Sequence, residues 1–308
     1  MITLTGLTKR YGTTTAVEDL TVEVRPGQVT GFLGPNGAGK STTMRMIVGL
    51  DHPSAGQALV LGRPYASLSS PLRHVGALLD DASSPSGRTA TAHLLATARS
   101  NRIPARRVSE VLDVVGLGDV AGRRVTSFSL GMRQRLGIAT ALLGDPAVLL
   151  FDEPVNGLDP DGVRWIRDLM RSMSAEGRTV LVSSHLMSEM QQTADHLVVL
   201  GRGRLLADAP LQEVIGAATS GAVRVRSPRA DVLADGLTVA GFTVDRTPGG
   251  LLVSGASSEE IGDLAHRLDA PVHELSRASA SLEQAYLQLT GGEVEYAARS
   301  VDPAGEGA

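Results

Sequence analysis

The segment Gly34–Thr42, GPNGAGKST, restricts the possible folds of this chain more than any other feature of the sequence. It matches the pattern G-x-x-x-x-G-K-S/T, it follows the β-prone run Val29–Leu33, and it precedes Ser41–Leu50, which has the composition of a helix. Glycines between a strand and a helix let consecutive backbone N–H groups point at an anion, and the helix adds the positive end of its dipole. The sequence therefore predicts a phosphate-binding loop inside an α/β domain.

The residue types of this loop suit a nucleoside triphosphate with Mg²⁺. Lys40 is expected to reach the β- and γ-phosphates, and the Ser41 hydroxyl is expected to bind the metal ion. Lys9 and Lys40 are the only lysines of the chain, so a chance match to the pattern is expected in under ~1 per cent of sequences of this composition. The residues expected to contact the nucleotide here are Gly34, Pro35, Asn36, Gly37, Ala38, Gly39, Lys40, Ser41 and Thr42.

Two carboxylates follow a second apolar run. Ala147–Phe151 has the continuous hydrophobicity of a strand covered on both faces, and Asp152 and Glu153 come directly after it. Asp152 suits the Mg²⁺ sphere, usually through water. Glu153 is placed to polarise an attacking water molecule. Many buried strands end in an acid, so the pair alone does not predict a nucleotide site. Together with the phosphate loop upstream, it does.

Strand-like and helix-like segments alternate over residues 1–215, which predicts an α/β domain with a largely parallel sheet. Residues 216–222 are Gly, Ala, Ser and Thr, the composition of a linker. Residues 223–290 have the order β-α-β-β-α-β of a small ferredoxin-like α+β module, followed by one more helix. The module could regulate, dimerise or only pack. The Gly- and Glu-rich residues 291–308 are expected to be disordered.

Composition excludes several classes of protein. The chain has no cysteine, and therefore no disulfide or thiolate metal site. Its net charge of −4 lacks the basic excess of a nucleic-acid binder, so no nucleic-acid partner is expected. No apolar run approaches the roughly 18 residues that a membrane span needs, and the N-terminus has no signal pattern. We therefore expect a soluble chain that reaches a membrane through a partner.

Further motifs resemble those of the ATP-binding-cassette (ABC) family. Phe128–Arg135, FSLGMRQR, resembles the family signature Leu-Ser-Gly-Gly-Gln with its usual basic-Gln-Arg continuation. Asn156–Asp159 resembles the D-loop, His185 resembles the switch histidine, and Tyr11 resembles the aromatic residue that stacks on adenine. The resemblance covers about residues 2–215 and is specific as a set, although His185 and Tyr11, taken alone, also fit ordinary structural roles.

The resemblance implies an ATP hydrolase that works with Mg²⁺ and a second ABC domain, in a homo- or heterodimer. In this family each ATP lies between the phosphate loop of one domain and the signature of the other. Ser129 and the Gly131 N–H would then contact the γ-phosphate across the dimer, and Asp159 would belong to the same nucleotide site. His185 would sense the γ-phosphate, and Glu153, His185 and Lys40 would be the catalytic residues. Ser129 also suits a helix N-cap, which has the same geometry.

Three departures from the family pattern are visible. Leu130 replaces the first signature glycine and Met132 the terminal glutamine, while Asp80 stands where the Q-loop glutamine is expected. Asp80 is a candidate Mg²⁺ ligand and a candidate link to the membrane partner; the alternative is a solvated loop acid. These features resemble the antibiotic-resistance and bacitracin-type export branch.

The expected function is therefore the motor subunit of an ABC exporter, bound at the cytoplasmic face of the membrane through a separate transmembrane permease. An importer motor is one alternative. The other is a soluble ABC ATPase acting on the ribosome or DNA; such relatives carry two cassettes or a long coiled coil, and this chain has one phosphate loop and no heptad segment.

Overall fold

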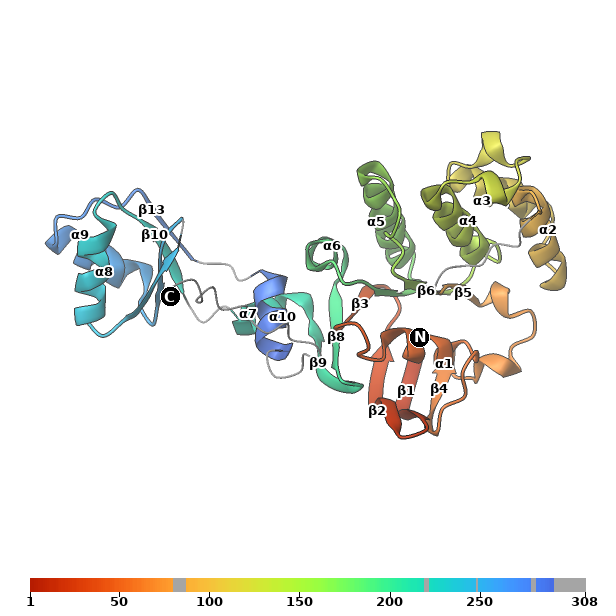
Figure 1. Cartoon of the computed structure of the whole chain (residues 1–308), viewed down its shortest axis with the longest axis horizontal. Coiled ribbons are helices and arrows are strands. Elements are labelled where there is room, and N and C mark those ends of the chain that lie inside the picture. Colours follow the sequence, from red (N-terminus) through yellow and green to blue (C-terminus); the bar gives the residue numbers. More distant parts are fainter. Residues whose placement is uncertain (80–86, 219–221, 248, 278–280, 291–308) are drawn as a thin grey trace, which may run out of the picture. The chain divides into compact units, whose positions relative to one another are not determined.

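The computed structural model describes residues 1–79, 87–218, 222–247, 249–277 and 281–290. The chain divides into two compact units, Met1–Pro210 and Leu211–Gln288, and each is built around sheets of its own (Figure 1). They are described separately.

The centre of the first unit is a six-stranded sheet with the order β5-β6-β7-β3-β8-β9. All neighbouring strands are parallel except β8 and β9, which form an antiparallel hairpin. Every residue of β3, β6 and β7 is buried, as expected for a sheet covered on both faces. The prediction of a largely parallel sheet is confirmed. The strands are β3 (Val29–Leu33), β5 (Val75–Leu78), β6 (Val148–Asp152), β7 (Thr179–Ser183), β8 (His196–Gly201) and β9 (Arg204–Pro210).

A smaller antiparallel sheet, β2-β1-β4, lies on the other side of helix α1 (Lys40–Ile47) (Figure 1). Its strands are β1 (Ile2–Tyr11), β2 (Thr14–Val24) and β4 (Ala55–Val60). Apolar side chains of this sheet, of α1 and of the central sheet form one core, so the two sheets hold α1 between them. The first two strands form a hairpin, in which Tyr11 pairs with Thr14 across a turn at Gly12, whose φ is +58°.

Helices α2, α3 and α4 cluster beside β5 and β6, whereas α5 contacts β3 and β7 and α6 contacts β3 (Figure 1). Short 3₁₀ turns connect several elements. The helices are α2 (Ala90–Ser100), α3 (Arg106–Val114), α4 (Leu130–Leu142), α5 (Pro160–Ala175) and α6 (Met187–Thr193). None of the helices in the described part of the chain is both long and apolar enough to cross a membrane.

The second unit contains a four-stranded antiparallel sheet with the order β11-β12-β10-β13. With two helices inserted after the first and third strands, this is the ferredoxin-like arrangement that the sequence predicts. Val225, Leu233 and Val253 are at the centre of its core. The elements are β10 (Val223–Arg226), α8 (Ala230–Val239), β11 (Thr243–Thr247), β12 (Gly250–Ser254), α9 (Ser258–Arg267), β13 (Glu274–Arg277) and α10 (Leu282–Thr290).

Helix α7 (Leu211–Ala218) was not predicted, and it continues into residues with the composition of a linker. Leu211 and Val214 are buried, and the Leu, Gln, Glu and Ala residues of this segment favour helices, so packing and propensity both support α7.

Candidate nucleotide-binding site

The phosphate loop connects β3 to α1 and is packed so closely that two of its positions admit only glycine. A Cβ atom on Gly34 would lie 2.7 Å from the carbonyl oxygen of Leu200, and one on Gly39 would lie 2.5 Å from that of Ala16. Gly39 is also the N-cap of α1, with a φ of +98°. No side chain caps this end of the helix, so the first N–H groups of α1 remain available to an anion.

Lys40 is buried at the start of α1. Its ammonium donates hydrogen bonds to the carbonyl oxygens of Gly34 at 2.7 Å and Pro35 at 3.1 Å, and no described carboxylate is within ion-pair distance. Burial lowers the pKa of Lys40, while the nearby charges of Glu153 and Asp152 act in the opposite direction. A desolvated cation that is bonded only to neutral carbonyls, at the mouth of a glycine-rich loop, fits a polyphosphate chain.

Asp152 and Glu153 are at the carboxyl end of β6, beside the end of β7. Ser183, the last residue of β7, links them: its hydroxyl donates to Asp152 Oδ1 and accepts from the Glu153 N–H at 3.0 Å. The Asp152 side chain is buried. These bonds fix the orientation of both acids relative to the sheet.

The Glu153 side chain contacts His185. Glu153 Oε2 is 2.8 Å from His185 Nδ1, and the glutamate has a φ of +48°, in the left-handed region. Facing a carboxylate, Nδ1 is the ring nitrogen that carries a hydrogen. The structure thus brings together two residues that lie 32 positions apart in the chain.

A metal ion at this site would have Ser41 and Asp152 as its protein ligands, since hydroxyl and carboxylate oxygens are what Mg²⁺ prefers. Among the described residues, no group of three or more His, Cys, Asp or Glu side chains could hold a metal ion by itself. Phosphate oxygens would therefore have to complete the coordination. The third predicted ligand, Asp80, lies outside the described residues.

The signature segment begins α4. Ser129 is its N-cap, with the hydroxyl accepting from the Met132 N–H at 3.2 Å, and Leu130 is 54% exposed. Gly131 and Gly157 are in close contact: a Cβ on Gly131 would lie 2.8 Å from the Gly157 carbonyl oxygen, and one on Gly157 would lie 2.4 Å from Leu130 Cγ. The signature and the D-loop therefore form one tightly packed surface.

The two remaining predicted nucleotide contacts, Asp159 and Tyr11, lie at the start of α5 and at the end of β1. Asp159 caps α5, where its carboxylate accepts from the Gly162 N–H at 2.9 Å. Tyr11, at the end of β1, is 48% exposed, and its hydroxyl donates to Asp51 at 3.1 Å. Lys9 Nζ is 4.8 Å from the centre of the Tyr11 ring. The ring thus keeps an accessible surface on which a base could stack.

Gln134 and Ser183 were not singled out from the sequence. Gln134 is part of the Gln-Arg continuation of the signature, which was the available signal. Its side-chain amide donates to the carbonyl oxygens of Glu153 and Pro154. The only sequence signal for Ser183 was its position at the end of a predicted strand, two residues before His185.

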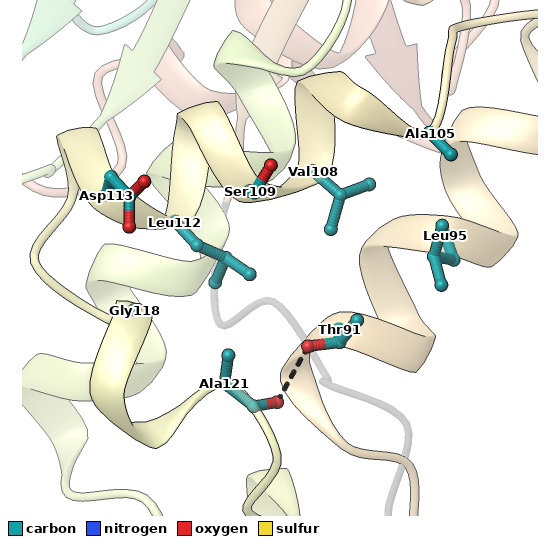
Figure 2. A pocket seen from close by; sticks show the side chains of 9 residues that line it. All are labelled: Thr91, Leu95, Ala105, Val108, Ser109, Leu112, Asp113, Gly118 and Ala121. Atoms are coloured by element: carbon teal, nitrogen blue, oxygen red, sulfur yellow. Dashed lines mark hydrogen bonds between the residues drawn. The ribbon is translucent and has the colours of Figure 1, made fainter.

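A cavity of about 330 Å³ lies away from these residues, between α2, α3 and the turn that follows α3. Figure 2 shows that Val108 and Leu112 of α3 face Leu95 and Thr91 of α2 across it, and that the Thr91 hydroxyl bonds to the Ala121 carbonyl. None of the predicted site residues lines this cavity.

Comparison with known proteins agrees with this geometry. Residues 17–156 match the family profile described as "ABC transporter", and residues 221–283 match one described as "Domain of unknown function (DUF8746)". The bacitracin transport ATP-binding protein BcrA of Bacillus licheniformis is 41% identical over 217 residues, covering 70% of this chain and 71% of that protein. The daunorubicin/doxorubicin resistance ATP-binding protein DrrA of Streptomyces peucetius is 33% identical over 305 residues, covering 94% of this chain and 92% of that protein.

A solved structure described as the ATP binding subunit of an ABC transporter superimposes with a TM-score of 0.66 at 27% identity, covering 70% of this chain and 92% of that one. The chain belongs to the ABC transporter ATP-binding family, and the first unit is its P-loop ATPase domain. The family and the fold class predicted from the sequence are thereby confirmed.

Proposed function

We propose that this chain is the ATP-hydrolysing subunit of an ABC exporter and drives transport through a separate membrane permease at the cytoplasmic face of the membrane. The relatives support this direction, since one is named for bacitracin transport and another for daunorubicin/doxorubicin resistance. The likeness to the second extends over 94% of the chain, beyond the ATPase domain. An antibiotic or similar drug is the substrate class that these names suggest.

The phosphate loop would bind the triphosphate of ATP. The backbone N–H groups after Gly34 and the end of α1 would cradle the phosphates, and Lys40 would turn from its two carbonyls to the β- and γ-oxygens. Mg²⁺, held by Ser41 and Asp152, would neutralise charge on those oxygens. Tyr11 would stack on the adenine.

The contact between Glu153 and His185 is the observation on which the hydrolytic role rests. Glu153 would take a proton from the attacking water as its oxygen forms a bond to the γ-phosphorus and the bond to ADP breaks. His185 would orient the glutamate and touch the γ-phosphate.

A second ABC domain would complete the site. Ser129 and Gly131, at the exposed N-terminus of α4, would contact the γ-phosphate bound by the partner's phosphate loop, and Asp159 would lie near the same interface. For the domain organisation we propose an ATPase domain over residues 1–215, a linker at 216–222, a module at 223–290 and a tail at 291–308.

Glu153→Gln tests the hydrolytic role, because it removes the base and keeps the shape. The variant should bind ATP, hydrolyse it very slowly and form a dimer in ATP that is visible by size-exclusion chromatography. Near-wild-type turnover would refute the role of Glu153.

The transport direction is tested in inside-out vesicles that contain this chain together with a candidate membrane permease. ATP-dependent accumulation of bacitracin or daunorubicin that is lost with Glu153→Gln would support export. ATP-dependent loss of the compound from preloaded vesicles would indicate an importer instead.

A further inference from the structure

The backbone of Glu153 has a conformation that ordinary residues avoid. Its φ of +48° is in the left-handed region, which costs a residue with a side chain about 1–2 kcal/mol. The direction of the Glu153 side chain follows from this backbone, so whatever stabilises the backbone also aims the carboxylate at His185 Nδ1.

Two side chains from different elements hold this backbone. On the N-terminal side, Ser183 Oγ of β7 accepts from the Glu153 N–H at 3.0 Å. On the C-terminal side, Gln134 Nε2 of α4 donates to the Glu153 carbonyl at 3.2 Å and to the Pro154 carbonyl at 3.0 Å. The Glu153 carbonyl also accepts from the Asn156 N–H at 3.2 Å, within the turn.

Gln134 is well suited to this task. Its amide faces two carbonyl oxygens, so only the NH₂ group can be directed at them, and both of its hydrogens are used. Pro154 is buried, so its carbonyl oxygen cannot turn to bulk water if the Gln134 bond is lost. An unmet buried carbonyl would favour a different path for the chain after β6.

The helix that carries Gln134 is itself fixed to the same region. Arg135, the next residue, stacks on Trp165 of α5 at 4.6 Å, and Leu130 packs against Gly157. These contacts on both sides of Gln134 fix α4, and so keep the Gln134 amide within hydrogen-bonding distance of the Glu153 and Pro154 carbonyls.

We infer that Gln134 is a positioning residue for hydrolysis: it ties the signature helix α4 to the left-handed backbone of Glu153 and so fixes the carboxylate that would activate water. This inference rests on the proposed function. Gln134 acts through Glu153, because both of its donors are bonded to the Glu153 and Pro154 carbonyls, so its loss should lower kcat and leave nucleotide binding intact.

The test uses the full chain and two substitutions that separate hydrogen bonding from shape. Gln134→Met keeps length and removes both donors, whereas Gln134→Glu keeps shape and presents only acceptors to the two carbonyls. Both should lower kcat by about 10- to 100-fold, with the KM for ATP within about twofold of wild type, because a small misplacement of a reacting group has effects of this size. Gln134→Asn carries the same donors on a shorter side chain, so its kcat should lie between that of these two variants and that of wild type.

Gln28→Met is the matched control. Gln28 is also half-buried, lies in the turn between β2 and β3, and makes no side-chain hydrogen bond within the described chain. It should leave kcat and KM unchanged. Thermal unfolding of each variant identifies any that are not folded, in which case the remaining Gln134 variants decide.

A double variant distinguishes positioning from a structural role. In the Glu153→Gln background, Gln134→Met should lower the residual single-turnover rate no further, since the group it positions is gone. An additional loss there, or a rise in KM that accounts for the whole defect, would overturn the inference, as would wild-type kcat in the folded Gln134 variants. If instead Glu153→Gln itself turns over normally, the proposed function fails and not only this inference.

Discussion

Replacing Lys40 by methionine separates nucleotide binding from folding more sharply than any other change in the loop. The substitution keeps an unbranched side chain that is one atom shorter and removes the ammonium. In the structure this ammonium is buried and bonded only to the carbonyl oxygens of Gly34 and Pro35. We expect the ATP affinity to fall steeply while the protein without nucleotide stays folded.

The expected magnitude follows from the bonds exchanged. A hydrogen bond between charged groups contributes about 1.5–3 kcal/mol, and the Lys40 ammonium gives up two neutral carbonyls to reach phosphate oxygens. A net loss of about 3 kcal/mol corresponds to a Kd for ATP roughly 100- to 200-fold higher. In the unliganded protein, relief of the desolvated charge offsets the two lost bonds, so the free energy of unfolding should stay within about 1 kcal/mol of wild type.

Isothermal titration calorimetry with ATP and Mg²⁺ measures the affinity, and thermal unfolding without nucleotide measures stability. Lys40→Arg should restore little of the affinity, because the planar guanidinium is wider than the ammonium. Arg25→Met is a suitable control, since Arg25 is exposed and has only a 3.7 Å contact with Glu23. An unchanged Kd in Lys40→Met would refute the site, and loss of affinity together with loss of folding would show that the lysine is structural.

Four more results are expected. Burial places the pKa of Lys40 below the usual lysine value, so the folded protein holds this proton less tightly than the unfolded chain. As the pH rises from the folded pKa to the unfolded pKa of Lys40, the free energy of unfolding should increase and the affinity for ATP should fall. Calorimetry of Lys40→Met should show neither trend. Gly76→Ala should destabilise the protein by about 2–3 kcal/mol in urea unfolding, since its Cβ would lie 2.0 Å from the Ala141 carbonyl; a loss under about 0.5 kcal/mol would contradict the tight β5–α4 contact. A chain ending at Gly216 should keep its ATP affinity, and a folded truncation that binds no ATP would show that the second unit completes the site. Asp80→Asn should leave ATP binding largely intact and weaken the Mg²⁺ dependence of ATPase activity; superimposable curves would make Asp80 an ordinary loop acid.

The sequence was sufficient where a motif is contiguous and its chemistry demands particular residue types. Gly34–Ser41 follows this rule: strand, glycines, lysine and hydroxyl appear in order, and the structure places them at the turn from β3 to α1. The alternation of apolar strands with helices was likewise enough for the parallel sheet, and the spacing of short elements after residue 222 was enough for the ferredoxin-like order. Helix α7 was missed because residues 216–218 have the composition of a linker, whereas the helix that begins at the buried Leu211 continues through them.

What the sequence could not show is how the catalytic candidates are held. Nothing in the letters Asp-Glu-Pro indicates that the glutamate has a left-handed backbone, because that conformation is favoured by partners that come from β7 and α4. Ser183 is 30 residues from Glu153 and Gln134 is 19 residues away, so neither contact leaves a local pattern. The sequence likewise places Gly157 in the D-loop without showing that the side chain of Leu130 fills the space a Cβ would need. In this chain the signature departs from the family pattern at Leu130, and the structure places that leucine against the D-loop, at the start of the helix that supports Glu153. The departure is therefore compatible with catalysis as long as Gly157 stays small and Gln134 keeps its two carbonyls.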